Sequence, residues 1–73
     1  MKELIKPPLP GKVLNILVSE GQEIKKGQVL FILEAMKMHN EIFSNFDGKI
    51  SKIFIKEEST VSINTNILEI EKL

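Results

Sequence analysis

The sequence predicts an all-β fold, and three observations support that prediction. The apolar runs are rich in Ile, Val and Phe, which favour strands. Segments that hold all four Gly and all three Pro separate these runs at short intervals, as in a small sandwich or barrel. The chain also divides into two similar halves. We expect strands at about 2–6, 12–18, 29–34, 39–44, 49–55 and 67–71, with short pieces near 23–24 and 60–61.

Length and composition exclude several classes of protein. The 73 residues predict one domain, residues 1–73, with no room for a second. The absence of Cys excludes disulfides and a zinc site of the usual kind. Ten lysines, no arginine and ten acidic residues give a formal net charge of zero, which is not typical of a nucleic-acid-binding protein. No apolar run approaches the roughly 18 residues of a membrane span, so we expect a cytoplasmic protein without membrane insertion.

The two halves align at an offset of 37 residues. Residues 11–20 match residues 48–57 (48 − 11 = 37). The segments begin with Gly11 and Gly48, and each of these two glycines is followed by apolar residues at the second, fifth and seventh positions. Apolar residues alternate at intervals of two in a half-buried strand, and the interval of three breaks that alternation. It predicts a bulge near residues 14–15 and another near residues 51–52.

The later part of the repeat aligns differently. Ile24 still matches Val61 at an offset of 37. Beyond this point we expect one extra residue in the second half, which raises the offset to 38. With that offset, three apolar residues of each half align, namely Val29, Leu30 and Ile32 with Ile67, Leu68 and Ile70.

Residues 31–42 fit either a helix or a pair of strands. Apolar residues recur there at the spacing of one helix face, at Phe31, Ala35, Met38 and Ile42. Residues 34–38 are also good helix formers. The internal repeat favours a strand, a tight turn near Met36-Lys37 and a returning strand. Composition and periodicity leave both alternatives open.

The same segment carries a motif. Glu34-Ala35-Met36-Lys37-Met38 resembles the attachment motif of biotinyl domains, the carrier modules of biotin-dependent carboxylases and decarboxylases. The resemblance covers about residues 7 to 71. It includes a Pro-x-Pro-Gly opening, a stretch with two regularly spaced glycines and a second half of the same pattern, at residues 8–13, 18–30, 48–50 and 67–70.

This resemblance implies a fold and a hairpin. The family's fold is a flattened antiparallel β-barrel of two sheets with an internal pseudo-two-fold axis and the lysine at a hairpin tip, which argues against the helix. The turn would form without Asn-Gly, although a type I′ turn needs positive φ at both central residues. Some carriers of acetyl-CoA carboxylases have a thumb loop in the first half. Residues 11–34 leave no room for one, so this chain resembles the thumbless type.

The resemblance also implies a function. Lys37 would hold a covalent biotin, within the attachment motif of Glu34, Ala35, Met36 and Met38. The chain would carry carboxylate between the active sites of an acyl-CoA, pyruvate or oxaloacetate type of enzyme and would not itself be an enzyme. Its partners would be a biotin protein ligase and the biotin carboxylase and carboxyltransferase or decarboxylase components. The two methionines would pack at the hairpin base or form a soft contact surface for partners.

Two other functions stay open. A lipoyl carrier has the same fold, but that family favours Asp-Lys-Ala around its lysine. An unmodified β interaction module is the second alternative. No catalytic residue or metal site is expected, because the single histidine, His39, has no evident partner and is expected to lie on the surface of a strand.

Other positions have structural interpretations. The family usually has Gly where Glu58 stands, so we expect a turn of different shape there, with Glu57 and Glu58 in solvent. All four glycines are expected to form turns, namely Gly11, Gly21, Gly27 and Gly48. All four phenylalanines are expected in the core, namely Phe31, Phe43, Phe46 and Phe54.

Overall fold

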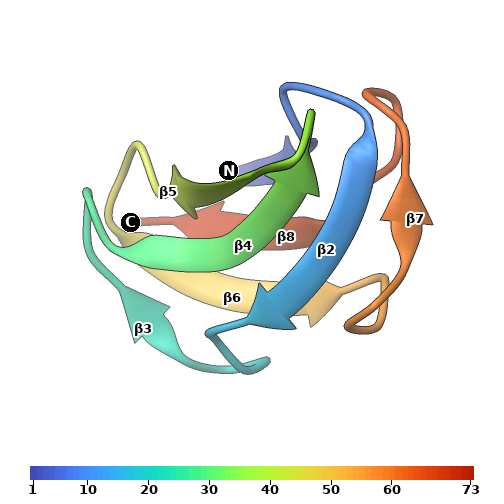
Figure 1. The fold of residues 1–73 in the computed structure, drawn as a ribbon. Coiled ribbons are helices and arrows are strands. Elements are labelled where there is room, and N and C mark those ends of the chain that lie inside the picture. The colour runs from blue at the N-terminus through green and yellow to red at the C-terminus, as the bar shows by residue number, and fades with distance from the viewer.

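The protein is described by a computed structural model that covers residues 1–73. It contains eight strands and no helix, which confirms the all-β prediction (Figure 1). The chain accordingly has no helix long and apolar enough to cross a membrane. The strands are β1 (Lys2–Ile5), β2 (Gly11–Ile16), β3 (Glu23–Ile24), β4 (Val29–Ala35), β5 (Met38–Phe43), β6 (Gly48–Ile53), β7 (Thr60–Val61) and β8 (Leu68–Lys72).

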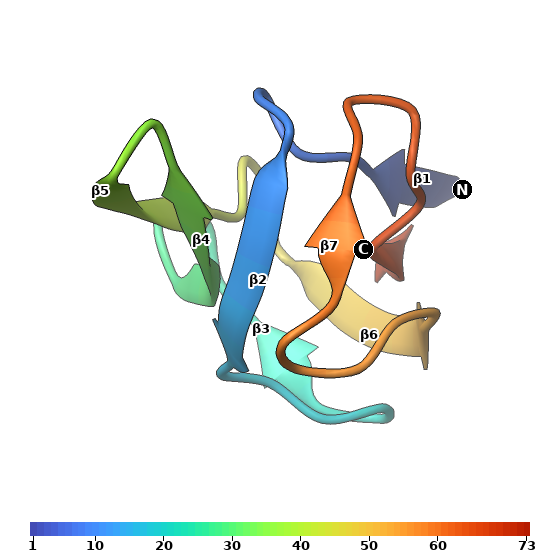
Figure 2. The same ribbon diagram turned by 45° about the vertical axis from the view of Figure 1, so that its right-hand side comes forward.

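The strands form two four-stranded antiparallel sheets that face each other. One sheet has the order β1-β8-β6-β3 and the other has the order β5-β4-β2-β7 (Figures 1 and 2). Each sheet therefore takes strands from both halves of the chain. The molecule is elongated, with extents of 34 × 20 × 17 Å. The predicted flattened barrel of two sheets is confirmed.

The two halves have the same strand pairing at a constant offset of 37 residues. Ile16 pairs with Phe31 in one sheet, and Ile53 pairs with Leu68 in the other. Adding 37 to the first pair gives the second. The predicted rise to 38 is therefore wrong, and Leu30, Phe31 and Leu33 correspond to Ile67, Leu68 and Ile70. Burial agrees, because these six residues are all in the core.

The first part of the repeat is confirmed in detail. The register between β2 and β4 shifts between Val13 and Asn15. The register between β6 and β8 shifts between Ile50 and Lys52, again 37 residues later. Each shift brings residues three apart onto the same face of the sheet, because the bulge adds one residue to the strand. The break in apolar spacing thus located both bulges.

Hydrogen bonds cross between the halves in matching pairs. The Ile16 N–H donates to a Glu57 carboxylate oxygen at 2.8 Å, and the Ile53 N–H donates to a Glu20 carboxylate oxygen at 2.9 Å. Each glutamate follows the end of one strand and satisfies the backbone at the end of the other. Glu57 and Glu58 are exposed, as expected, and Glu57 in addition forms this bond to the other half.

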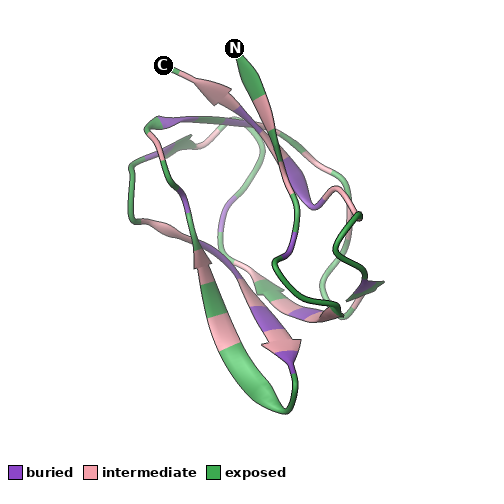
Figure 3. Ribbon diagram, turned by 90° about the horizontal axis from the view of Figure 1, so that it is seen from above, coloured by how far each residue is buried: buried purple, intermediate pink, exposed green.

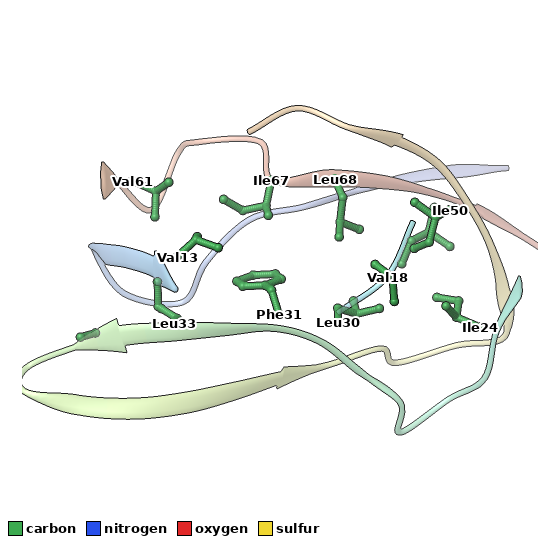
Figure 4. Close-up of a cluster of buried hydrophobic side chains, with 12 residues drawn as sticks. Val13, Val18, Ile24, Leu30, Phe31, Leu33, Ile50, Val61, Ile67 and Leu68 are labelled. Carbon is green, nitrogen blue, oxygen red and sulfur yellow. The ribbon is translucent and has the colours of Figure 1, made fainter. Parts of the chain in front are cut away.

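The core lies between the sheets and contains twelve buried apolar residues (Figure 4). Phe31 lies near the middle of this layer, between Leu33 and Val13 on one side and Leu30 on the other. The prediction that all four phenylalanines are buried is only partly right. Phe46 packs against the core, whereas Phe43 and Phe54 are about half-exposed. Phe43 pairs with Val29 at the end of β5, and Phe54 lies just past β6.

Two glycines are not turn residues, contrary to expectation. Gly11 and Gly48 begin β2 and β6, where a neighbouring strand passes very close. A Cβ at Gly11 would lie 2.2 Å from the Glu34 carbonyl oxygen, and one at Gly48 would lie 2.5 Å from the Glu71 carbonyl oxygen. These positions need Gly because there is no space for a side chain, at equivalent points of the two halves.

The turn at Glu58 has the same shape as its counterpart, which corrects a second expectation. Glu58 has φ 74° and Gly21, its equivalent, has φ 88°. The Glu58 N–H donates to the Val13 carbonyl at 2.6 Å, as the Gly21 N–H donates to the Ile50 carbonyl at 2.7 Å. The hydrogen bond to the other half imposes the left-handed conformation on Glu58. That conformation costs roughly 1 kcal/mol for a residue with a Cβ.

Candidate functional site

The sequence motif lies on the hairpin formed by β4 and β5. Ala35 and Met38 form the last pair of the ladder, so Met36 and Lys37 make a two-residue turn. Their φ angles are 53° and 63°, both in the left-handed region that a type I′ turn requires. The hairpin alternative is confirmed, and the helix alternative for residues 31–42 is wrong.

Packing explains why helix-forming residues make a strand here. Phe31, Leu33 and Ala35 alternate along β4 and are buried against the core. In a helix, residues two positions apart point in different directions, so these three side chains could not all face the core. Burial of the large side chains is worth on the order of 1.5–3 kcal/mol each, whereas intrinsic helix preferences amount to a few tenths per residue.

Lys37 stands free at the tip of the molecule. The hairpin projects from the body at one end, and the two chain termini lie together at the opposite end (Figure 3). The tip is exposed, and Lys37 takes part in none of the ion pairs of the structure. A lysine in this place presents its amine to any protein that approaches the tip.

The methionines beside Lys37 are on the surface. Met36 is 82% exposed and Met38 is 64% exposed. The interpretation that they pack at the base of the hairpin is therefore wrong. Ala35, in contrast, is buried, and a Cβ placed on Gly11 would lie 3.2 Å from the Ala35 Cβ. Of the motif residues, Ala35 thus holds the hairpin to the body, and the methionines face solvent.

Polar side chains line the outer face of the hairpin just below the turn. Glu34 lies opposite His39 in the ladder, and the Glu34 carboxylate oxygen is 3.7 Å from His39 Nε2. His39 is on an exposed strand surface as predicted, but it does have a partner. Lys12 of β2 lies opposite Glu34 on the other side of β4, and its Nζ lies 3.0 Å from a Glu58 carboxylate oxygen.

One residue that braces the hairpin was not singled out from the sequence. The Asn40 side-chain amide donates to the carbonyl oxygens of Leu33 and Met38, both at 3.3 Å. The bond to Leu33 ties β5 to β4 three residues from Lys37, and the bond to Met38 stays within β5. A polar residue opposite buried Leu33, on the inward side of an alternating strand, is the signal that could have identified it.

The arrangement can present a nucleophilic amine but offers no enclosed site around it. The structure has no pocket, and no three His, Cys, Asp or Glu side chains gather where they could hold a metal ion. The chemistry available at the tip is therefore that of a single exposed lysine between two thioethers.

Similarity to known proteins extends over almost the whole chain. The family model described as "Biotin-requiring enzyme" matches residues 3–70. The chain is 54% identical over 50 residues to the methylmalonyl-CoA decarboxylase gamma subunit of Veillonella parvula, covering 68% of this chain and 39% of that protein. It is 41% identical over 63 residues to the biotin carboxyl carrier protein of Streptococcus mutans, covering 86% of this chain and 48% of that protein. The chain thus spans less than half the length of these relatives.

Solved structures share the fold. A single-chain, multi-domain long-chain acyl-CoA carboxylase superposes with a TM-score of 0.93 at 21% identity, over 99% of this chain and 7% of that chain. The urea carboxylase of Kluyveromyces lactis superposes with a TM-score of 0.88 at 24% identity, over 97% of this chain and 6% of that chain. These structures share the fold of this chain, and the family model that matches residues 3–70 shows that the chain belongs to the biotin/lipoyl family of biotin-requiring enzymes.

Proposed function

We propose that Lys37 is the attachment point of a covalent biotin and that the chain is a carrier domain that moves carboxylate between the active sites of a carboxylase or decarboxylase. The observation that carries this proposal is the exposed Lys37 in the two-residue turn of the β4–β5 hairpin, at the end opposite the termini. The family match and the name of one relative, a biotin carboxyl carrier protein, support it.

The residues of the chain account for attachment as follows. The turn holds Lys37 outside the ladder, and Asn40 and Ala35 keep both strands in place beneath it. The lysine amine, once neutral, attacks an activated acyl group that a biotin protein ligase supplies. An amide forms and the activating group leaves. The positive charge of Lys37 is lost, so the formal net charge falls from zero to minus one.

Biotin would supply a ring nitrogen that holds the carboxylate, and the chain supplies reach and position. The lysine stem and the biotin acyl chain together make about eleven bonds, a swing of ~14 Å from the Lys37 Cα. Longer travel requires movement of the whole domain, which is 34 Å along its longest axis. Because both termini lie at the far end, any flanking chain would leave the Lys37 tip free to enter a partner's site.

The partners are other components of a carboxylase or decarboxylase. The relatives and structural neighbours are named as subunits or large single chains of such enzymes, in which this domain occupies a minor part. We propose that this chain works with a biotin carboxylase and with a carboxyltransferase or decarboxylase component of the acyl-CoA, pyruvate or oxaloacetate type. In that arrangement the chain is a carrier and the partners perform the catalysis.

Mass spectrometry of the protein expressed with a biotin ligase tests the proposal. We expect one biotinyl increment, located on the peptide that contains Lys37, and binding to streptavidin. Lys37→Arg keeps the charge and should lose both signals completely, whereas the control Lys2→Arg, at the opposite end, should keep them. Labelling of Lys37→Arg would overturn the assignment of the residue. A lipoyl increment, or no increment, would overturn biotin as the group.

A further inference from the structure

Two sulfur atoms flank Lys37, and both are accessible. Met36 lies in the turn and Met38 begins β5, so the methionines are the residues immediately before and after Lys37. They are 82% and 64% exposed. A thioether is oxidised to a sulfoxide when an oxidant can reach its sulfur. The tip therefore offers two reactive positions directly beside the proposed attachment point.

The fold does not depend on these side chains. Neither methionine belongs to the core cluster or to the apolar residues that pack against it. The hairpin is held instead by the ladder, by buried Ala35 and by the Asn40 amide. Oxidation of methionine usually damages a protein by placing a polar group in an apolar core. At this tip a sulfoxide would lie in solvent, so the fold can tolerate it.

We propose that Met36 and Met38 form a reversible oxidation site that controls how the Lys37 tip engages its partners. Each thioether takes one oxygen atom from hydrogen peroxide and becomes a sulfoxide, and the peroxide is reduced to water. Methionine sulfoxide reductases reverse the change. The oxidation itself requires only the observed exposure. Its effect on carboxyl transfer rests on the proposed function of Lys37.

The effect follows from the chemistry of the surface. A thioether is apolar and polarisable and makes favourable contacts with aromatic and apolar groups. A sulfoxide is polar and a strong hydrogen-bond acceptor, and it must be desolvated when the tip enters a partner's site. Each oxidised methionine therefore makes one side of the Lys37 tip polar. The domain stays folded, but a partner surface that binds the thioethers through apolar contacts would lose those contacts.

Peptide mapping tests whether the site exists. The biotinylated protein is treated with hydrogen peroxide, catalase removes the excess, and the oxygen gained by each methionine is measured over time. Met1 is the internal reference, because it is 83% exposed and lies at the other end. Met36 and Met38 should oxidise at a rate within about a factor of three of Met1, with the thermal midpoint unchanged. Slow oxidation of both residues, or loss of the fold, would overturn the proposal.

Turnover with untreated partner enzymes tests the consequence. Carboxyl transfer per biotinylated domain should fall about two- to tenfold for each oxidised methionine, the size of a lost Met contact, and a reductase should restore it. The control is the double variant Met36→Leu with Met38→Leu. It should transfer carboxylate more slowly than the unoxidised protein, and peroxide should not change its rate. Equal turnover before and after oxidation would overturn the control role. Absence of biotin on Lys37 would instead overturn the proposed function and would leave the oxidation rates unaffected.

Discussion

The hairpin end and the terminal end of the molecule are built from equivalent strands but closed differently. At the hairpin end the chain runs from β4 to β5 through Met36 and Lys37. At the terminal end the equivalent strands β8 and β1 pair in the same register, without a turn to join them. Lys37 is the centre of the chain, with 36 residues on each side. The repeated strands thus form the same structure at both ends of the domain. Only the turn of Met36 and Lys37 turns one end into a tip that exposes a lysine.

Equivalent core positions should give equal losses of stability if the halves share one architecture. Leu33 and Ile70 are fully buried and lie 37 residues apart. Leu33→Ala and Ile70→Ala should each lower the free energy of unfolding by roughly 2–5 kcal/mol, because each leaves a cavity between the sheets. Urea denaturation of both variants measures this. Losses that differ by several kcal/mol would show that one half dominates the fold.

The close approaches at Gly11 and Gly48 provide a test at each end. Gly11→Ala and Gly48→Ala should each cost about 2–3 kcal/mol, since the new methyl group meets a carbonyl oxygen of the neighbouring strand. Gly11→Ala should also shift the NMR signals of the hairpin, because Gly11 lies against Glu34 and Ala35. A cost below about 0.5 kcal/mol in either variant would mean that the strands separate easily.

The equivalent turns at Gly21 and Glu58 allow their residue types to be exchanged. Glu58→Gly should raise the free energy of unfolding by about 0.5–1 kcal/mol, because Gly adopts the left-handed conformation without strain. Gly21→Ala should lower it by about 1 kcal/mol, although no atom lies within 4 Å of the new Cβ.

Lys12→Gln is the control for these two turns, since it removes only the exposed Lys12–Glu58 ion pair and should change stability by less than about 0.5 kcal/mol. A destabilised Glu58→Gly variant would assign a larger role to that pair.

The smallest expected difference is electrostatic and lies at the terminal end. The Met1 ammonium, hydrogen-bonded to Glu71 at 2.9 Å, lowers the pKa of that carboxyl group, and desolvation opposes this only in part. Because the folded-state pKa is lowered, the associated stability is present above the ordinary pKa of Glu and is lost as the pH falls through the folded-state value. Acetylation of the Met1 amine should therefore raise the pKa of Glu71 in an NMR titration. An unchanged pKa would show that the contact is not kept in solution.

Local sequence determined much of this protein. The apolar alternation located the strands, and the break in spacing located both bulges. These two features depend on residues a few positions apart, where the geometry of a strand permits only certain residue types. The motif around Lys37 pointed to the family by its resemblance to a known attachment motif. Gly21 and Gly27 form turns as predicted, and both have positive φ, a conformation that is also set by residues close in sequence.

The tertiary structure decided the features that depend on contacts across the molecule. Residues 31–42 are a hairpin because their alternating face meets a core that a helix could not fill. Glu58 is left-handed because its N–H bonds to Val13 of the other half. Phe43 and Phe54 are exposed because each follows an isoleucine that packs against the core, Ile42 or Ile53, and adjacent residues of an extended segment point to opposite sides. The constant offset of 37 residues is likewise determined by the pairing register of the strands. A one-dimensional pattern of apolar residues states which side chains prefer burial, whereas hydrogen bonding and packing between distant strands decide which of them are buried.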